Sequence, residues 1–238
     1  MQAFTHRERP ELSDRVDSAD VWPEYNRHGD VPNRFWGRMI DELPDYQFVL
    51  VEGDEVLAEG HTVPIAWDGT VEGLPEGFDG ALAGAFGGGE PNTLCAMAIE
   101  ILPAHQSRRL SVPMLEEMKA IATRDGFETL LAPLRPSWKE RYPLTPIERY
   151  VAWKREDGLP FDPWLRVHVR MSGEILKPEP ESLRITGTVT EWEAWTETAF
   201  PESGTYVFPH GLAPVEIDRE ADVGRYWEPN VWVLHRVR

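Results

Sequence analysis

The chain has little of what membrane-spanning, secreted and zinc-scaffolded proteins depend on. One cysteine among 238 residues excludes an internal disulfide framework and indicates a reducing compartment. No Cys/His cluster has the spacing of a structural zinc site, so we expect no metal. There is no run of about 18 apolar residues, and the N-terminus lacks the apolar segment of a signal peptide. The composition therefore predicts a cytoplasmic protein without a membrane span.

Basic residues are also scarce. The chain has 24 Lys and Arg against 41 Asp and Glu, a net charge of −17. Such a charge repels nucleic acid and anionic membranes, so we expect neither as a partner. It fits a soluble or salt-adapted protein, and it also fits attraction of a cationic amine. The length allows one large domain or two small ones with a substantial core.

The stretch from Thr93 to Gly126 contains the clearest local pattern. An apolar run, Leu94 to Leu102, is interrupted only by Glu100 and predicts a buried strand that Pro103 ends. Ser111 is a suitable N-cap for an amphipathic helix, and Gly126 supplies its left-handed stop. The stretch therefore predicts a strand, a tight basic turn and a helix.

This turn is suited to an anion. Amides at a helix N-terminus are unpaired and carry the positive end of the helix dipole. Arg108 and Arg109 stand beside them, which makes a phosphate or pyrophosphate site plausible. A solvated turn before an amphipathic helix is the alternative interpretation.

The same residues resemble the acyl-CoA motif of the GNAT (Gcn5-related N-acetyltransferase) superfamily, a strand followed by Q/R-x-x-G-x-G/A. Gln106 matches the first position, whereas Arg109 and Ser111 stand where the two glycines are usual. The resemblance implies that acetyl-CoA or another acyl-CoA is the cosubstrate. It also implies a set of residues around its pyrophosphate and thioester: Ile101, Leu102, Gln106, Ser107, Arg108, Arg109, Leu110, Ser111 and Val112.

The order of the remaining elements agrees with that superfamily. We expect a helix over 33–43, a hairpin of strands 46–51 and 56–64, a strand over 127–133, a helix over 146–154 and a strand over 164–175. The spacing of Val16, Val21, Trp22 and Tyr25 predicts an earlier helix, as in the family pattern. The fold class is therefore mixed α/β, with a central sheet of about six or seven strands and helices on both sides.

Two regions extend this pattern. The segment 65–92 has eight glycines and reads as a long flexible connection in which Trp67 and Phe78 either cover a cleft or anchor the loop. Residues 178–238 predict a strand-rich extension, with strands over 182–189, 205–208, 212–217 and 231–235 and a helix over 191–200. We therefore divide the chain into a core, 1–177, and an extension, 178–238, that either closes the substrate pocket or forms a homodimer contact.

Catalytic candidates follow from chemistry and from the resemblance. Glu100 is the only charge in an apolar strand, where a carboxylate suits general-base work; a structurally paired carboxylate is the alternative. In the family a backbone amide at a break in this strand binds the thioester carbonyl, which here falls near Ile101 and Leu102. Tyr150 lies where many members place a tyrosine general acid, although helix packing also explains it.

Three other reactive residues are weaker candidates. His61 and His105 are spare acid–base groups, and Cys95 reads as a buried small hydrophobe. Two functions remain open. One is a CoA-dependent N-acyltransferase acting on a small-molecule amine by direct attack on the thioester. The other is a catalytically weakened GNAT-like protein that binds an acyl thioester or a protein partner without turnover.

Overall fold

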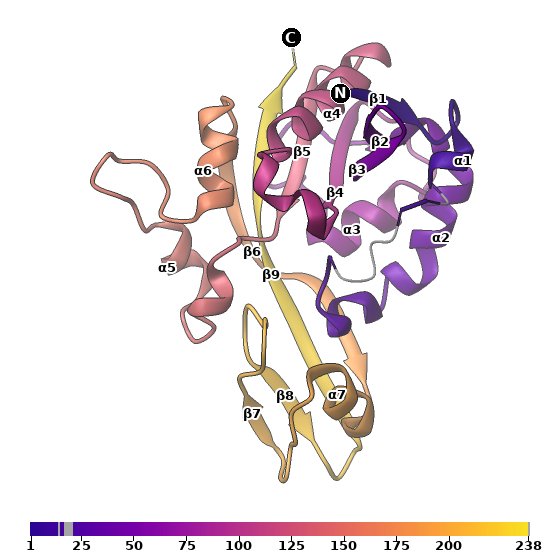
Figure 1. The fold of residues 1–238 in the computed structure, drawn as a ribbon. Helices are drawn as coiled ribbons and strands as arrows, with labels where there is room; N and C mark the ends of the chain where they lie inside the picture. The colour runs from indigo at the N-terminus through magenta and orange to yellow at the C-terminus, as the bar shows by residue number, and fades with distance from the viewer. Residues whose placement is uncertain (14, 17–20, 238) are drawn as a thin grey trace.

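The computed structural model describes residues 1–13, 15–16 and 21–237, which form a single nine-stranded sheet flanked by helices (Figure 1). Eight strands follow the order β1-β2-β3-β4-β5-β9-β8-β7, and β6 pairs with the remaining edge of β9. Only β4 and β5 are parallel. The predicted mixed α/β class is confirmed, but the expected six or seven strands are too few. The strands are β1 (Gln2–Thr5), β2 (Gln47–Glu52), β3 (Glu55–Ile65), β4 (Thr93–Ile101), β5 (Thr129–Leu134), β6 (Glu174–Gly187), β7 (Gly204–Tyr206), β8 (Val215–Asp218) and β9 (Val223–Arg236).

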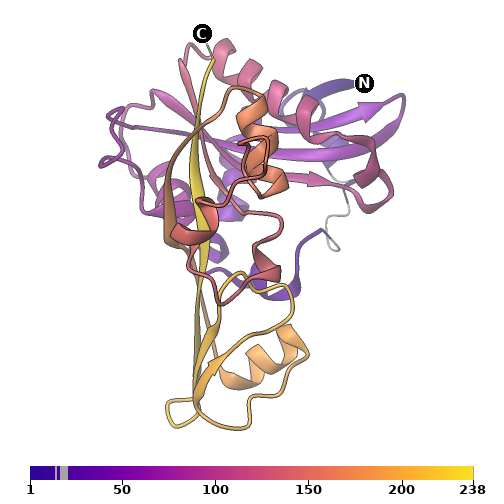
Figure 2. The same cartoon turned by 90° about the vertical axis from the view of Figure 1, so that its left-hand side faces the viewer.

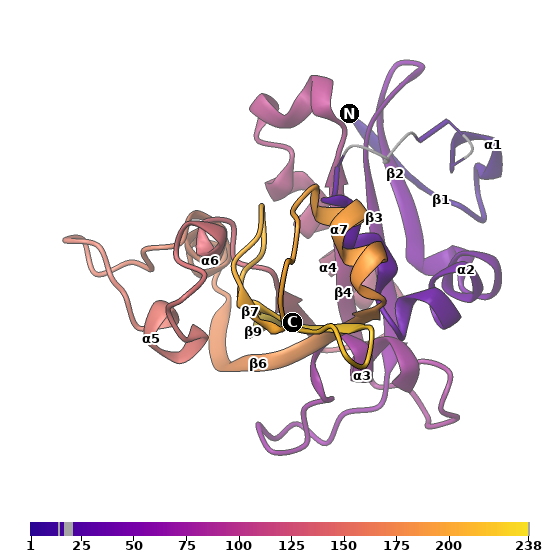
Figure 3. The same ribbon diagram turned by 90° about the horizontal axis from the view of Figure 1, so that it is seen from below.

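Helices cover both faces because successive strand residues point to opposite sides. Leu94 and Leu130 pack with the apolar face of α4 (Ser111–Arg124), whereas their neighbours Cys95 and Leu131 pack with α2 (Pro32–Glu42) and α3 (Gly77–Gly84). The remaining helices are α1 (Pro10–Ser13), α5 (Ile147–Val151), α6 (Pro163–Arg170) and α7 (Val189–Thr196). Seen from below, α5 and α6 lie on one side of the molecule and α1 and α2 on the other (Figure 3).

The unit of strand, turn and helix predicted around Thr93–Gly126 is present. β4 ends before Pro103, and Gly126 has the expected positive φ of 81°. Two details differ. Ser111 is the first helical residue and not the N-cap, a position that Leu110 takes without a side-chain capping bond. The turn itself is a 3₁₀ helix, Pro103–Arg108, followed by Arg109 in the left-handed region.

The strand expected over 164–175 is wrong, because α6 occupies its first half. Asp162 caps this helix by accepting hydrogen bonds from the amides of Trp164 and Leu165, and Pro163 fits the first turn. The cap outweighs the alternating pattern of Trp164 to Arg170. Strand β6 begins only at Glu174, and helix α5 is shorter than the expected helix over 146–154.

The C-terminal region contributes strands to the central sheet. β6 and β9 form a long antiparallel ribbon that leaves the main body and carries β7, β8 and α7 at its far end (Figures 1 and 2). The expected boundary at 177/178 lies inside β6, and β9 pairs with β5 through residues 231–236. The extension therefore supplies a central strand.

The N-terminal region contains a strand, β1, that the sequence pattern did not indicate. Of the expected helix around Val16 to Tyr25, residues 17–20 lie outside the described part of the chain, and a short 3₁₀ helix, η1 (Glu24–His28), follows. The expected flexible connection over 65–92 contains α3. Among the described residues, no helix combines the length and apolar composition that a membrane crossing requires.

Candidate active site

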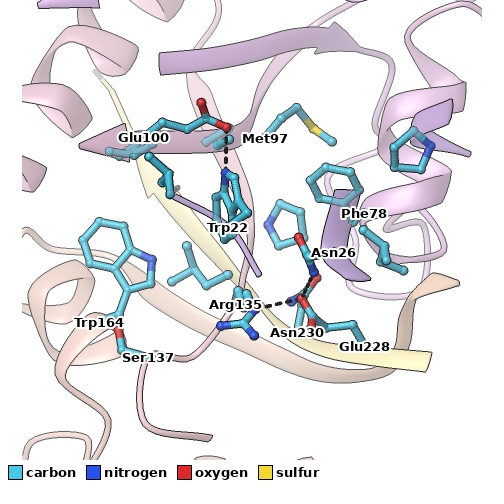
Figure 4. Close-up of a pocket in the computed structure, with 18 of the residues that line it drawn as sticks. Trp22, Asn26, Phe78, Met97, Glu100, Arg135, Ser137, Trp164, Glu228 and Asn230 are labelled. Atoms are coloured by element: carbon cyan, nitrogen blue, oxygen red, sulfur yellow. Dashed lines mark hydrogen bonds and ion pairs between the residues drawn. The ribbon is translucent and has the colours of Figure 1, made fainter. Parts of the chain in front are cut away.

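The sheet opens between β4 and β5. These parallel strands pair only at Leu94 with Leu130 and Cys95 with Leu131. Beyond that point β4 continues along β3 and β5 continues along β9, so the two strands diverge. A cavity of about 1150 Å³ fills the opening, lined by residues 96–101 of β4 and residues 133–135 at the end of β5 (Figure 4). Its size suits a large ligand.

A β-bulge lies in β4 at the edge of this cavity. Ala96 pairs with Thr62 and Ala98 with His61, so Met97 is the extra residue. Bulges interrupt pairing and re-aim backbone groups, and they are frequent beside active sites. The break was expected near Ile101 and Leu102, which is wrong. Ile101 still pairs with Ala58, and the Leu102 amide donates to the Leu57 carbonyl oxygen at 3.1 Å.

The turn before α4 contributes part of what was expected. Gln106, Ser111 and Ile101 line the cavity. Arg108 does not line it and instead forms an ion pair with Glu52 at 2.7 Å. The backbone of Arg109 is in the left-handed region, with a φ of 56°, and this is the position where the family motif has its first glycine. The other predicted cofactor contacts, Leu102, Ser107, Leu110 and Val112, are not among the lining residues.

The start of α4 keeps an anion-binding character. Ser111, its first residue, lines the cavity, and the first amides of any α-helix have no partner within the helix. The first turn contains no acidic side chain that would repel an anion. The cavity therefore runs from a positive helix end to the diverging edge of β4.

Glu100, the residue predicted as general base, lines the cavity. Its side chain is buried, with 5% of the residue exposed, and one carboxylate oxygen accepts a hydrogen bond from Trp22 Nε1 at 2.6 Å (Figure 4). Glu100 also borders a second, smaller cavity together with Glu59 and His61. The ligand atoms of these three residues lie within 4.8 Å of one another, close enough to hold a metal ion.

The neighbours of Glu100 have shifted ionisation. Burial lowers the pKa of His61, but the hydrogen bond and charge of Glu59, with the charge of Glu100, outweigh burial and raise the pKa overall. Burial raises the pKa of Glu59, but hydrogen bonds from His6 and His61 outweigh it and lower the pKa to about 2. The contact between the two residues therefore favours the protonated form of His61 and the ionised form of Glu59.

The other candidates lie elsewhere. Tyr150 is buried, does not line the cavity, and donates its hydroxyl hydrogen to Asp162 at 2.8 Å. This placement does not fit the expected general acid, nor a hydroxyl at the surface. His105 contacts Glu55 at 3.3 Å, away from the cavity. Cys95 is buried in the apolar core, and burial raises the pKa of its thiol.

A polar network that the sequence did not reveal forms another wall. Glu228 accepts hydrogen bonds from Arg135 Nε at 2.9 Å and Asn26 Nδ2 at 2.8 Å (Figure 4). It also accepts one from the Tyr25 hydroxyl at 3.1 Å. Burial lowers the pKa of Arg135, but the charge of Glu228 together with the contacts to Tyr25 and Tyr226 outweighs burial and raises the pKa. These residues come from η1, the end of β5 and β9, and no local motif connects them. Asn230, on β9, lines the same wall.

The cavity is closed on the α6 side by Trp164 and His168, which the sequence analysis also missed. His168 is buried, and its Nδ1 lies 2.8 Å from Nε2 of His235. Burial lowers the pKa of His168 well below its ordinary value. Residues 164–170 were expected to form a strand. The placement of Trp164 and His168, four residues apart on one face of α6, could therefore not be inferred.

Comparisons with known proteins agree with this geometry. No family model matches the chain. It is 30% identical to the arginine N-acetyltransferase AvaD of Aspergillus versicolor, over 92% of this chain and 86% of that protein.

Two solved structures share the fold over nearly the whole chain. The loading GNATL domain of CurA from Lyngbya majuscula has a TM-score of 0.63 at 20% identity, covering 99% of this chain and 97% of that one. The GNAT-like decarboxylase GphF, solved in complex with isobutyryl-CoA, has a TM-score of 0.63 at 19% identity, with both chains fully covered. The chain therefore belongs to the GNAT superfamily.

Proposed function

We propose that this protein transfers an acyl group from acetyl-CoA or another acyl-CoA to the amine of a small molecule, by direct attack of the amine on the thioester. The observation that carries the proposal is the opening between β4 and β5. It joins a helix N-terminus at Ser111 to a buried carboxylate at Glu100 within one cavity.

The cosubstrate fits along this opening. Its pyrophosphate would lie at the start of α4 around Ser111, within the stretch Arg108 to Val112, where the dipole of α4 favours negative charge. Its thioester would lie along the edge of β4 beside the bulge at Met97. Backbone amides there are in reach of the thioester carbonyl oxygen, the role that such donors have in acyl transfer.

Glu100 is the group we assign to proton removal. The Trp22 hydrogen bond occupies one of its oxygens, and the other accepts no hydrogen bond from any residue that the structure describes. Glu100 takes a proton from the acceptor, and the neutral amine nitrogen that results attacks the thioester carbonyl carbon and gives up its surplus N–H proton as the tetrahedral intermediate collapses. The C–S bond then breaks, and the thiolate takes up a proton and leaves as the CoA thiol. A positioned base of this kind contributes roughly 10²–10⁴-fold in rate.

The acceptor would be cationic. Besides Glu100, two carboxylates line the cavity, Glu140 and Glu228, and the chain as a whole is strongly acidic. Because the relative AvaD is named an arginine N-acetyltransferase, arginine is the first acceptor to test, followed by other small amines.

The test measures acylated amine and CoA thiol for the wild type, for Glu100→Gln and for Glu220→Gln, a matched control at an exposed site away from the cavity. We expect Glu100→Gln to bind acetyl-CoA normally and to lose roughly 10²–10⁴-fold in kcat. Unchanged turnover would remove Glu100 from the mechanism. A wild-type protein that binds acetyl-CoA but acylates no amine would be the weakened, non-catalytic GNAT-like protein.

A further inference from the structure

A second cavity, of about 260 Å³, lies against Glu100. Its polar lining consists of His6, Ser13, Glu59, His61 and Glu100, and its apolar lining of Trp36 and Ile40. Acyl transfer uses only Glu100 among these residues. Of the remaining polar residues, His6, Glu59 and His61 are buried and call for a separate explanation.

The charges in this cluster are unusual. Glu59 and Glu100 are direct cross-strand partners on β3 and β4, with 7% and 5% of each residue exposed. Like charges directly opposite one another destabilise a sheet, and buried carboxylates need positive partners. Among the described residues, no Lys or Arg side chain forms an ion pair with either carboxylate. The cationic partners that the described residues offer are imidazoles: His6 and His61 lie against Glu59, and His61 also lies near Glu100.

The orientation of His61 is determined by Gln47. The side-chain amide nitrogen of Gln47 donates to the carbonyl oxygens of Leu43 at 3.0 Å and Thr62 at 2.9 Å. Its Oε1 therefore faces His61 Nδ1, at 3.1 Å, and can only accept. Nδ1 of His61 must carry the hydrogen, which directs Nε2 to Glu59, 3.6 Å away. Nε2 is therefore the ring nitrogen of His61 that can bind an ion on the side of the two carboxylates.

Each of the three acidic or imidazole groups has one orienting partner. Gln47 hydrogen-bonds to His61, and Trp22 Nε1 donates to Glu100 at 2.6 Å. His6 Nε2 lies 2.8 Å from a Glu59 oxygen, an ion-pair distance without hydrogen-bond geometry. Metal ligands are typically held in this way by outer hydrogen bonds. One imidazole and two carboxylates, with ligand atoms within 4.8 Å, suit Zn²⁺ or a similar divalent ion.

We propose that Glu59, His61 and Glu100 bind one divalent transition-metal ion, with Zn²⁺ as the representative, and that the small cavity holds its water ligand. Binding itself does not depend on the acyltransferase activity. One consequence does rest on the proposed function: because Glu100 would be both ligand and base, the metal-loaded protein should not acylate amines.

The test is titration of the EDTA-treated full chain with Zn²⁺ by calorimetry, together with metal analysis after dialysis. We expect one equivalent of Zn²⁺ per chain and a loss of affinity of at least about 100-fold in His61→Asn. His105→Asn is the matched control, because His105 also contacts a glutamate but lies outside the cluster. It should bind like the wild type. Trp22→Phe removes only the outer hydrogen bond to Glu100 and should weaken binding by roughly 10–100-fold.

Two results would overturn the metal site: no binding at millimolar Zn²⁺, or equal affinity in the wild type and His61→Asn. If His61→Asn does not fold, judged by circular dichroism, Trp22→Phe decides, and unchanged affinity there counts against the site. If the EDTA-treated protein acylates amines but binds no Zn²⁺, the proposed metal site is wrong and the proposed acyltransferase activity stands. If the protein binds Zn²⁺ but acylates no amine, the proposed activity is wrong and the proposed metal site stands.

Discussion

Single carboxylates in this protein differ according to what touches them. Glu59 has two imidazole neighbours that hold its pKa at about 2 against burial. Asp79, at the start of α3, is mostly buried and receives one hydrogen bond, from the Arg184 amide at 2.9 Å. Burial, with the nearby charge of Asp30, therefore raises the pKa of Asp79 to about 6. Its other oxygen is buried without a hydrogen-bond partner among the described residues.

This difference predicts a pH-dependent gain in stability for Asp79→Asn. The pKa of Asp79 is raised from 3.8 to about 6 on folding, so its favourable contribution is complete below pH 3.8 and is lost as the pH rises to about 6. At pH 8, Asp79→Asn should raise the free energy of unfolding by on the order of 1 kcal/mol, after discounting for partial exposure. Urea denaturation at pH 8 and near pH 4.5 measures this, and an equal gain at both values would contradict the ionisation argument.

Among the residues of the site, the ones inferred from sequence belong to one local unit. Glu100, Gln106 and Ser111 lie within a single strand, turn and helix, so their composition and spacing indicated a site. Arg135, Trp164, His168 and Glu228 come from separate elements and meet only after folding. Tyr150 was placed by analogy of position, but its hydroxyl is directed to the cap residue of the next helix, Asp162.

At the scale of elements, the turn before α4 allows a test of whether the arginine side chains or the helix start would bind the pyrophosphate. Arg108 is paired with Glu52 and does not line the cavity, whereas Ser111 lines it at the helix start. If the amides and dipole of α4 bind the pyrophosphate, a negative charge introduced at position 111 should weaken binding more than one introduced at position 108.

We therefore expect Ser111→Asp to weaken acetyl-CoA binding by at least about tenfold, a cost of ~1.4 kcal/mol. Arg108→Glu should have a smaller effect, although larger than Arg184→Glu, which lies on β6 and pairs with Asp30. Calorimetric titration with acetyl-CoA compares the three variants. Equal losses in all of them would indicate general charge attraction and would remove this turn from the cofactor site.

Local signals predicted some elements and misled on others for physical reasons. The β2–β3 hairpin and the β4–α4 unit have their own turn and stop residues, so their sequences were sufficient. The α6 segment has an alternating pattern, but the cap formed by Asp162 and Pro163 makes it a helix. β1 is only four residues long and is defined by its pairing with β2, which no local pattern reveals.

At the scale of the whole molecule, a buried ion pair joins three distant segments. Arg135 follows β5, Glu228 lies on β9, and Tyr25 and Asn26 of η1 bond to the same carboxylate. β9 also pairs with β5 and β6, so the C-terminal region is part of the core. The position of β9 beside β5 depends on contacts between residues far apart in the sequence. No local pattern reveals such contacts, so the sequence suggested that residues 178–238 form a separate extension.

The pair predicts non-additive effects on stability. Glu228→Leu leaves the Arg135 guanidinium buried without its partner and should cost about 3–5 kcal/mol of unfolding free energy. Adding Arg135→Met should recover part of this loss, because neither charge is then left unpaired. Urea denaturation of the two single variants and the double variant gives the coupling energy. Strictly additive losses would show that the pair does not act as a unit.

The central claim is amine acylation by a cosubstrate bound between β4 and β5. The most direct measurement incubates EDTA-treated protein with acetyl-CoA and arginine, or a panel of other small amines, and quantifies acylated amine and CoA thiol together. We predict that the two products appear in equal amounts, depend on the amine, and fall by roughly 10²–10⁴-fold in Glu100→Gln. Thiol release that yields no acylated amine, or carbon dioxide release from a carboxyacyl-CoA with no amine acylated, would contradict the account.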